Sequence, residues 1–324
     1  MYLCAVITLV GNDLLKVLNF LRAGELVAIP TETVYGLAAD CMNDRAVQKI
    51  FEVKQRPTTN PLILHVESIE RIYPLVNEFP DTFKQLAKVF CPGPLTFLIK
   101  KSSLVSEYIT AGNERVAIRI PKHPLTLKLI AALDAPIAAP SANLYGKLSP
   151  TEAKHVKNQL DGKIPYILDG GECQRGIEST IIGLEKNEVV IYRLGSITPE
   201  DLAQQLGYMP GLKVHSNDIP VASGMVKYHY APITTCSFFD PMKPCDESAG
   251  YIFLSKNLLS SSSINIRILS PTENLDEAAK NLYSTLHDVD NGGFSHIYIE
   301  KVPDVGIGMA INDRIGRAVA KFHF

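Results

Sequence analysis

Short apolar runs alternate with amphipathic stretches along most of the chain, and this alternation restricts the fold more than any other feature. Runs typical of buried strands occupy residues 26–29, 62–64, 95–99, 116–120 and 136–139. Between them, apolar side chains recur at helical spacing in residues 14–21, 44–51, 83–90 and 125–133. The pattern predicts an α/β domain with a mixed sheet that ends near residue 210.

Local signals mark where some of these elements begin or turn. Asp44 is a candidate N-cap of the second helix, and residues 149–152 have the sequence pattern of a capping box. The apolar runs 181–184 and 189–192 flank Lys186 and Asn187, which predicts a β-hairpin.

The chain changes character between residues 210 and 235. This segment has little periodicity and is punctuated by proline and glycine, so we interpret it as a linker. After residue 249 strand and helix patterns alternate again, which predicts a second, mainly parallel sheet. The predicted organisation is a first domain over residues 1–210, a linker over 211–236 and a small α/β domain over 237–324.

Composition excludes some classes of protein. The formal net charge of −2 gives no overall basic field for nucleic acid, although it permits a local basic groove. No run reaches the ~18 apolar residues of a membrane span, and the apolar residues 2–10 read as a first strand, not a signal peptide. The six cysteines show neither a Cys-x-x-Cys pair nor zinc spacing, which favours reduced thiols in a cytoplasmic protein.

Polar side chains follow the strand predicted over residues 26–29. They are Thr31, Glu32, Thr33 and Tyr35, all within residues 30–36. Polar groups at the end of a strand are a common way to place chemistry at the edge of a sheet. Two cations, Lys54 and Arg56, follow further along the chain. Acceptors, hydroxyls and cations so close in sequence predict a ligand that carries a phosphate or a carboxylate.

Other candidate residues have structural interpretations that compete with the functional ones. Arg119 lies inside an apolar strand, where it would form either a buried salt bridge or a clamp for an anionic ligand, and Arg193 repeats this pattern. Ser141 and Asn143 follow a strand and suit either turn bonds or ligand binding. His65 follows the apolar run 62–64 as a lone histidine, which favours a structural role for this residue. The chain has no Gly-x-Ser-x-Gly elbow and no Walker loop, so neither a hydrolase nucleophile nor a P-loop is supported.

An ordered set of short motifs resembles the YrdC family. In chain order the motifs occupy residues 30–37, 54–57, 60–62, 92–96, 117–121, 140–143 and 177–181. More narrowly, the chain resembles the two-domain threonylcarbamoyl-AMP synthases, because residues 227–232 are similar to their linker and residues 308–314 to their second domain. The resemblance implies a YrdC-like twisted mixed sheet with helices, followed by a smaller Rossmann-like α/β domain.

The same resemblance implies an activity. L-threonine, bicarbonate or CO2 and ATP would give threonylcarbamoyl-AMP and pyrophosphate, with Mg²⁺ carried mainly by the ATP phosphates and any protein ligands to the metal left unassigned. The product would serve threonylcarbamoyladenosine formation at tRNA position 37 through separate transferase proteins. Positioning and charge neutralisation would provide most of the catalysis, so we assign no nucleophile and no general base.

By matching motif positions, the resemblance also implies which residues bind each substrate. ATP would contact Lys54, Arg56, Asn60, Arg115, Ser141, Ser149, Arg193 and Tyr230, with Lys54 on its phosphates and Tyr230 folding the linker over the nucleotide. Threonine would contact Thr33, His65, Arg119, Ala139 and Ser179, with Arg119 on its carboxylate. Similar sequences often carry threonine where this chain has Arg115. Glu32 and Tyr35 receive no role.

Two other function classes remain open at this stage. A concave site lined by Lys54, Arg56, Arg119 and Arg193 could bind an RNA backbone without catalysis, because a fold does not fix a function. A carbamoyl transferase acting on another acceptor is the second alternative. Salt-sensitive RNA binding would distinguish the first, and the choice of amine substrate would distinguish the second.

Overall fold

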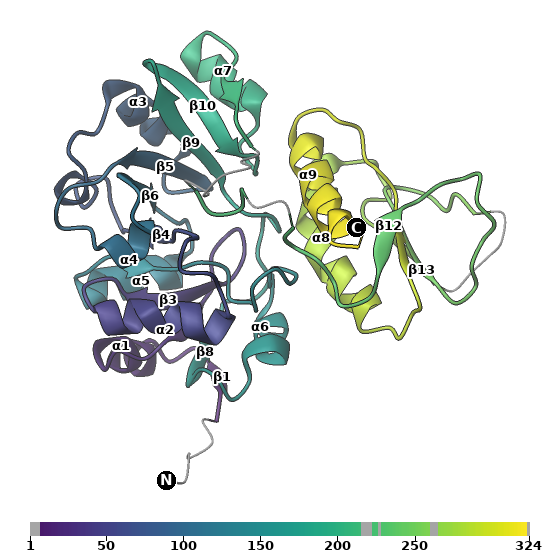
Figure 1. Cartoon of the computed structure of the whole chain (residues 1–324), viewed down its shortest axis with the longest axis horizontal. Helices are drawn as coiled ribbons and strands as arrows, with labels where there is room; N and C mark the ends of the chain where they lie inside the picture. The colour runs from purple at the N-terminus through teal and green to yellow at the C-terminus, as the bar shows by residue number, and fades with distance from the viewer. Residues whose placement is uncertain (1–6, 215–221, 226–227, 260–264, 323–324) are drawn as a thin grey trace.

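The computed structural model describes residues 7–214, 222–225, 228–259 and 265–322. Over these residues the chain forms one eleven-stranded sheet and one four-stranded sheet, each with its own helices. Figure 1 shows the two sheets side by side, with the chain crossing once from the first to the second. The predicted α/β class and the two-sheet architecture are confirmed.

The first sheet is mixed, as the sequence predicted. Its strand order is β1-β8-β2-β3-β7-β4-β6-β5-β9-β10-β11, with parallel and antiparallel pairs interspersed. The strands are β1 (Leu9–Gly11), β2 (Val27–Ile29), β3 (Gly36–Asp40), β4 (Ile63–His65), β5 (Leu95–Lys100), β6 (Arg115–Arg119), β7 (Ile137–Ala138), β8 (Tyr166–Leu168), β9 (Thr180–Glu185), β10 (Glu188–Arg193) and β11 (Gly211–Leu212). The strand predicted over residues 2–10 falls partly outside the described residues. The predicted hairpin is confirmed, because β9 and β10 pair antiparallel around Lys186 and Asn187.

Helices pack on this sheet. They are α1 (Leu14–Arg22), α2 (Asp44–Lys54), α3 (Asp81–Phe90), α4 (Glu107–Thr110), α5 (Pro124–Leu133), α6 (Ala153–Leu160) and α7 (Pro199–Leu206), with a short 3₁₀ helix at Tyr73–Leu75. Helices α1, α2, α3 and α5 lie at the predicted positions, whereas α4 and the short 3₁₀ helix were not predicted. None of these helices, nor any other in the described part of the chain, is long and apolar enough to cross a membrane.

Two capping predictions were wrong. The N-cap of α2 is Asn43, whose side chain accepts from the Arg45 and Ala46 N–H groups, and not Asp44. The capping box at residues 149–152 does not form, because α6 begins after Glu152 without a side-chain cap. The Ser149 hydroxyl donates instead to the Glu178 carboxylate at 2.6 Å.

The second sheet is entirely parallel. Its order is β12-β15-β13-β14, formed by β12 (Cys236–Phe238), β13 (Gly250–Phe253), β14 (Ile266–Ile268) and β15 (Ile297–Ile299). Helices α8 (Leu275–Asp290) and α9 (Ile307–Ala320) lie between this sheet and the first domain (Figure 1). Buried residues of α8 and α9 join one apolar cluster with buried residues of the first domain, so the two domains share a continuous core.

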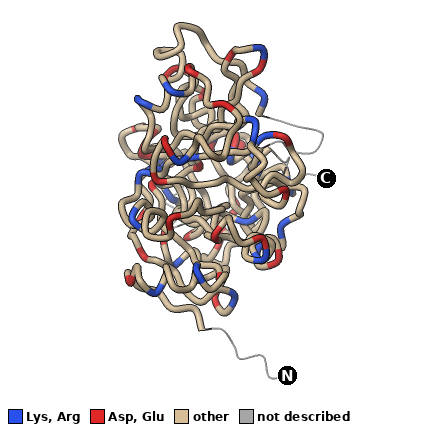
Figure 2. Tube along the Cα trace, turned by 90° about the vertical axis from the view of Figure 1, so that its left-hand side faces the viewer, with Lys and Arg blue, Asp and Glu red and all other residues tan. Residues whose placement is uncertain are grey.

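Strand register determines which side chains meet at the end of the first sheet. His65 at the end of β4 pairs with Arg119 at the end of β6, and Arg119 pairs with Thr96 of β5. Side chains of paired residues point to the same face of a sheet. Residues more than fifty positions apart in the chain are therefore neighbours. Figure 2 shows that acidic and basic residues are interspersed along the trace, with no large region of one sign.

Candidate active site

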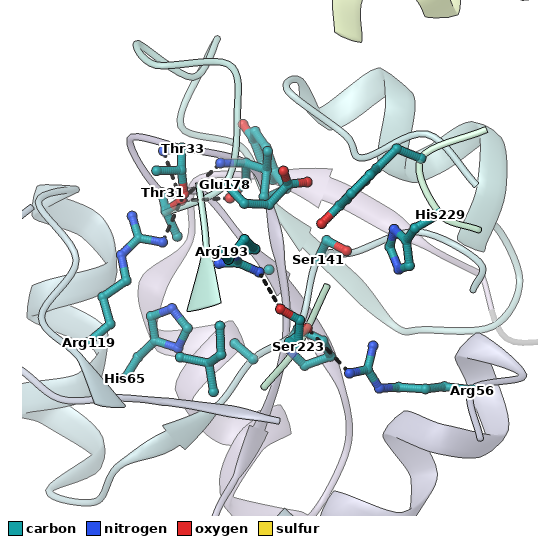
Figure 3. A pocket seen from close by; sticks show the side chains of 17 residues that line it. Thr31, Thr33, Arg56, His65, Arg119, Ser141, Glu178, Arg193, Ser223 and His229 are labelled. Carbon is teal, nitrogen blue, oxygen red and sulfur yellow. Dashed lines mark hydrogen bonds between the residues drawn. The ribbon is translucent and has the colours of Figure 1, made fainter. Parts of the chain in front are cut away.

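A pocket lies where the polar turn between β2 and β3 meets the ends of β4, β6 and β10 (Figure 3). It holds about 490 Å³ of empty space, a volume that includes the open solvent at its mouth. The polar residues that line it are Thr31, Thr33, Tyr35, Arg56, His65, Arg119, Ser141, Glu178, Arg193, Ser223, His229 and Tyr230. Three arginines around one cavity favour an anionic ligand.

The turn after β2 is shaped by the Thr31 hydroxyl. It donates to the Val34 carbonyl at 2.6 Å and accepts from the Thr33 and Val34 N–H groups at 3.1 and 3.2 Å. Such hydroxyl-to-backbone bonds stabilise a tight turn in place of ladder bonds. The turn returns the chain into β3 and presents the Thr33 hydroxyl to the pocket.

Arg119 is a buried cation with both structural and binding capacity. Its Nη2 lies 2.8 Å from Glu32 Oε1, its Nη1 donates to the Thr33 hydroxyl at 2.9 Å and its Nε donates to the Gly93 carbonyl at 3.2 Å. A guanidinium carries five N–H groups, so N–H groups on Nη1 and Nη2 remain without a partner among the described residues. The predicted buried salt bridge is therefore confirmed, and Arg119 also faces the cavity, where the clamp for an anionic ligand stays a prediction.

Glu32, which the sequence left without a role, stabilises this cation. Burial opposes ionisation of Glu32, but the Arg119 charge and the Lys122 N–H outweigh burial and hold the pKa of the carboxyl below its ordinary value. Glu32 is therefore an anion at neutral pH. Tyr35 has a different role, because its hydroxyl donates to the Gly171 carbonyl at 2.8 Å and fixes that loop against the turn.

His65 is a neutral ring in the pocket wall. Burial, helped by the Arg119 charge, lowers its pKa to about 3. Its Nδ1 is buried and has no hydrogen-bond partner among the described residues. An unsatisfied buried nitrogen costs free energy unless a ligand satisfies it, so His65 has the capacity to accept a hydrogen bond from a ligand.

Two further arginines face each other across a linker residue. Arg56 donates through Nη2 to Asn60 Oδ1 at 2.7 Å and to Ser223 Oγ at 3.4 Å. Arg193 donates through Nη1 to the Ser223 carbonyl at 3.3 Å and through Nη2 to Ser179 Oγ at 2.9 Å. Burial lowers the pKa of Arg56 to about 10, which leaves the group charged at neutral pH. Ser223 thus bridges two cations at the pocket, although no sequence signal indicated it.

His229 and Tyr230, from the segment interpreted as a linker, also line the pocket, and both side chains are buried. We call these two residues the roof of the pocket. Tyr230 has a φ of 61°, a left-handed conformation that is uncommon for a bulky residue. A Cβ at Gly224 would lie 2.7 Å from the Tyr230 hydroxyl and 2.9 Å from Arg193 Cδ, so this position accommodates only glycine.

Most predicted site residues gather at this pocket. Those that line it are Thr33, Arg56, His65, Arg119, Ala139, Ser141, Arg193 and Tyr230. Three others lie one contact behind the lining: Asn60 accepts from Arg56, Ser179 from Arg193, and Ser149 donates to Glu178. Glu178 was quoted in a sequence motif without a role, and it proves to be a lining residue.

Lys54 and Arg115 lie away from the pocket lining. The Lys54 ammonium donates to the Ser141 and Asn143 carbonyls, each at 2.5 Å, and burial holds its pKa well below the ordinary value. Arg115 stacks over Tyr192 at 5.0 Å and donates to its hydroxyl at 2.9 Å. Neither residue lines the cavity, and the predicted contacts of Lys54 and Arg115 with ATP stay predictions.

The pocket offers no protein site for a metal ion. Glu178 is the only carboxylate among its described lining residues. The oxygens of Glu178 already accept from Ser149, Tyr283 and Arg314. No group of three or more His, Cys, Asp or Glu residues suited to a metal occurs in the described part of the chain. The side chains present do not fit a protein-held Mg²⁺.

Comparison with known proteins agrees with this geometry. Residues 19–195 match the Sua5/YciO/YrdC family model described as "Telomere recombination". Residues 197–320 match the model described as "Threonylcarbamoyl-AMP synthase, C-terminal domain". The chain belongs to the two-domain threonylcarbamoyl-AMP synthase family. The order of the two matches is the order of the two sheets.

Members of this family resemble the chain over nearly its whole length. The threonylcarbamoyl-AMP synthase of Pyrococcus abyssi is 40% identical, over 93% of this chain and 92% of that protein. That of Bacillus subtilis is 39% identical, over 92% and 90%. The crystal structure of P. abyssi Sua5 complexed with L-threonine has a TM-score of 0.88 and 36% identity, over 97% of this chain and 98% of that chain.

Proposed function

We propose that this chain condenses L-threonine, bicarbonate or CO2 and ATP into threonylcarbamoyl-AMP and pyrophosphate. The observation that carries the proposal is one pocket that combines Arg119, with unused N–H groups, and the pair Arg56 and Arg193 across Ser223. An amino acid carboxylate and a triphosphate are two anions, and the pocket has separate cations for each. Membership of the family supports the same reaction.

Threonine would lie at the Arg119 end of the pocket. The unused N–H groups of Arg119 suit a carboxylate, and the Thr33 hydroxyl lies beside them. The neutral His65 could accept a hydrogen bond from the substrate through Nδ1. Ala139 lines the same pocket and Ser179 lies behind it. The P. abyssi relative that binds L-threonine supports this assignment.

ATP would lie at the other end, under the linker. Arg56 and Arg193 would neutralise its phosphates, Ser141 would donate to them and Tyr230 would cover the nucleotide. Asn60 and Ser149 would act by holding Arg56 and Glu178. We also propose, from the family resemblance, that Lys54 and Arg115 contact ATP, although neither lines the pocket. We assign no protein ligand to Mg²⁺, and no step depends on it.

The reaction needs positioning more than covalent help from the protein. The uncharged amine of threonine attacks CO2 and loses a proton to solvent, which gives a carbamate. A carbamate oxygen then attacks the α-phosphorus of ATP in line, the bond to the β-phosphate oxygen breaks and pyrophosphate leaves. Both the carbamate and the mixed anhydride are labile in water, so the buried roof of His229 and Tyr230 would protect them.

We propose that the product is used at tRNA position 37, which requires a separate transferase protein or direct contact with tRNA. A cytoplasmic location follows from this substrate. It is supported by the five described cysteines, all of which are free, whereas Cys4 lies outside the described residues. We also propose residues 211–236 as the linker between domains over 1–210 and 237–324, since Tyr230 of this segment lines the pocket.

A pyrophosphate release assay tests the proposal. Purified protein with ATP, bicarbonate and Mg²⁺ should release pyrophosphate only when L-threonine is added, and threonylcarbamoyl-AMP should be detected by mass spectrometry. Release without threonine dependence would contradict the proposal. Turnover of carbamoyl phosphate with another amine would favour a carbamoyl transferase, and salt-sensitive RNA binding without ATP binding would favour an RNA-binding module.

A further inference from the structure

The second domain inserts an arginine beside the wall of the pocket. Arg314, on α9, is only 1% exposed and is the largest side chain so deeply buried among the described residues. It belongs to the four-stranded domain, yet three of its interactions are with other parts of the chain. An arginine at this depth needs a partner for its charge and its N–H groups.

Three partners of Arg314 belong to the pocket or adjoin it, and a fourth is the neighbouring Asp313 on the same helix, 2.6 Å from Nη1. Its Nε lies 2.8 Å from Glu178 Oε2, its Nη2 donates to the Leu194 carbonyl at 2.7 Å and its guanidinium lies 4.9 Å from the centre of the Tyr230 ring. Glu178 and Tyr230 line the pocket, and Leu194 follows Arg193. One side chain therefore contacts the end of β10, the carboxylate in the wall and the aromatic ring in the roof.

We infer that Arg314 is a positioning residue of the active site, through which the second domain holds Glu178 and Tyr230 in the geometry that closes the pocket over its substrates. The inference rests on the proposed function. It gives the second domain a task in the reaction, although no residue of α8 or α9 lines the cavity.

The conformation of Tyr230 supports this role. A bulky residue with a φ of 61° is strained and stays in place only when its surroundings fix it. The Arg314 guanidinium lies over the Tyr230 ring. The ring of Tyr283, on α8, lies 6.0 Å from the Tyr230 ring, measured between ring centres. Both contacts come from the second domain, so undocking of this domain would release the strained tyrosine.

Glu178 supplies the second argument. Its carboxylate is buried in the pocket wall, where an uncompensated negative charge would repel phosphates. The second domain provides two of its donors, Arg314 at 2.8 Å and the Tyr283 hydroxyl at 3.2 Å from each oxygen, and Ser149 provides the third. Docking of the second domain therefore neutralises a charge at the site.

The amount of threonylcarbamoyl-AMP formed per pyrophosphate released distinguishes a positioning role of Arg314 from a purely stabilising one. A loosened roof admits water, which attacks the α-phosphorus in place of the carbamate oxygen and gives AMP and pyrophosphate. The full-length wild type and Arg314→Lys are compared for threonylcarbamoyl-AMP formed per pyrophosphate released, at equal incubation times. Lysine keeps the charge opposite Glu178 but cannot also reach Leu194 and stack flat on Tyr230. We expect the ratio to fall roughly threefold to thirtyfold.

Lys280→Ala is the matched control. Lys280 lies on α8 and reaches across the domain contact to Glu172 at 3.8 Å, but its side chain is 45% exposed and touches no pocket residue. We expect its product ratio to equal that of the wild type. An Arg314→Lys protein with an unchanged ratio overturns the inference, and so does a lower melting temperature with both products reduced in parallel.

A double variant tests the positioning role of Arg314 if Arg314→Lys does not fold. Glu178→Gln with Arg314→Met removes both charges of this pair, and Asp313 keeps Arg317 as its ion-pair partner. We expect it to fold and to show a reduced product ratio, whereas a wild-type ratio would overturn the inference. If the wild type itself releases no pyrophosphate with threonine, the proposed function fails instead, and the two failures are distinguishable.

Discussion

Two buried arginine–glutamate pairs in this molecule have the same N···O distance but different surroundings. Arg119 and Glu32 lie 2.8 Å apart at the pocket, and Arg314 and Glu178 lie 2.8 Å apart at the domain contact. In the first pair, Arg119 Nη2 and Glu32 Oε1 have no partner among the described residues other than each other. In the second pair, both carboxylate oxygens of Glu178 have further donors, from Ser149 and Tyr283.

The difference shows how one ion pair can bind a ligand while another stabilises the contact between two domains. A buried polar group left partly unsatisfied beside a cavity gains free energy when a ligand completes its bonds. A fully bonded pair gains nothing from a ligand, and it costs several kcal/mol to break one partner away. Unsatisfied capacity, rather than charge alone, distinguishes the candidate site from the domain contact.

Removal of the carboxylate at the domain contact should have the largest effect on stability. Glu178→Ala leaves the two buried cations Arg314 and Arg317 with Asp313 as their one shared carboxylate, which should reduce the free energy of unfolding by about 3–5 kcal/mol. Urea denaturation followed by circular dichroism measures this. A variant as stable as the wild type would show that the two pairs do not differ in the way described.

Removal of the cation at the pocket should have the largest effect on activity. Arg119→Ala takes away the proposed partner of the threonine carboxylate, and the loss of about 2–5 kcal/mol corresponds to roughly a thirtyfold to several-thousandfold lower kcat/KM for threonine. Steady-state kinetics with a circular dichroism control measures this. A folded variant with normal kcat/KM would remove Arg119 from the site, and an unfolded one would assign it to structure alone.

The domain contact should weaken in acid. Burial opposes ionisation of Glu178, but the charges of Arg314 and Arg193 outweigh it and lower the pKa of Glu178 from 4.5 to about 2. A lowered pKa in the folded state stabilises the fold above pH 4.5, and this stability is lost as the pH falls toward 2. The melting temperature of the wild type should therefore approach that of Glu178→Gln over this interval. A constant difference would contradict the prediction.

A smaller effect on activity, without loss of stability, should follow from His65→Leu. The change removes the Nδ1 atom that has no partner in the described structure, so the free energy of unfolding should stay equal or rise by about 1 kcal/mol. The KM for threonine should rise by about tenfold if a hydrogen bond of about 1–1.5 kcal/mol is lost. Because the pKa of His65 is about 3, its titration should not appear in the pH profile near neutrality. An unchanged KM would exclude the proposed contact.

The smallest effect should come from an exposed ion pair at the same domain contact. Lys280→Ala removes a 3.8 Å contact with Glu172 between two largely exposed side chains. Such pairs contribute about 0–1 kcal/mol, so the urea midpoint should shift little. A large shift would show that surface charges, and not the pair of Arg314 and Glu178, hold the domains together.

Much of the fold was predictable because it depends on local periodicity. Strands β2, β4, β5 and β6 lie close to the predicted runs, and the polar turn after β2 does face the site. Asp44 and the capping box were wrong because a neighbouring Asn43 and a distant Glu178 compete for the same groups. Such competition is invisible in a single short motif.

Lys54 and Arg115 lie outside the pocket lining, and the local backbone geometry explains why. Lys54 and Arg56 are two positions apart, but Gln55 between them has a φ of 53° and turns the chain, which sends Lys54 to backbone carbonyls and Arg56 to the pocket. Arg115 and Arg119 share a face of β6, yet four residues of strand separate them by about 13 Å. Sequence spacing alone does not specify either direction or reach.

The sequence by itself determined the order of helices and strands, the polar turn at residues 30–36 and the family resemblance, because all three are carried by local patterns. Only the tertiary structure decided which cations share the pocket, that Ser223 lies between Arg56 and Arg193, and that Arg314 meets Glu178 from 136 residues away. The physical reason is that strand register and domain docking bring distant residues together, and burial then sets their charge states and partners.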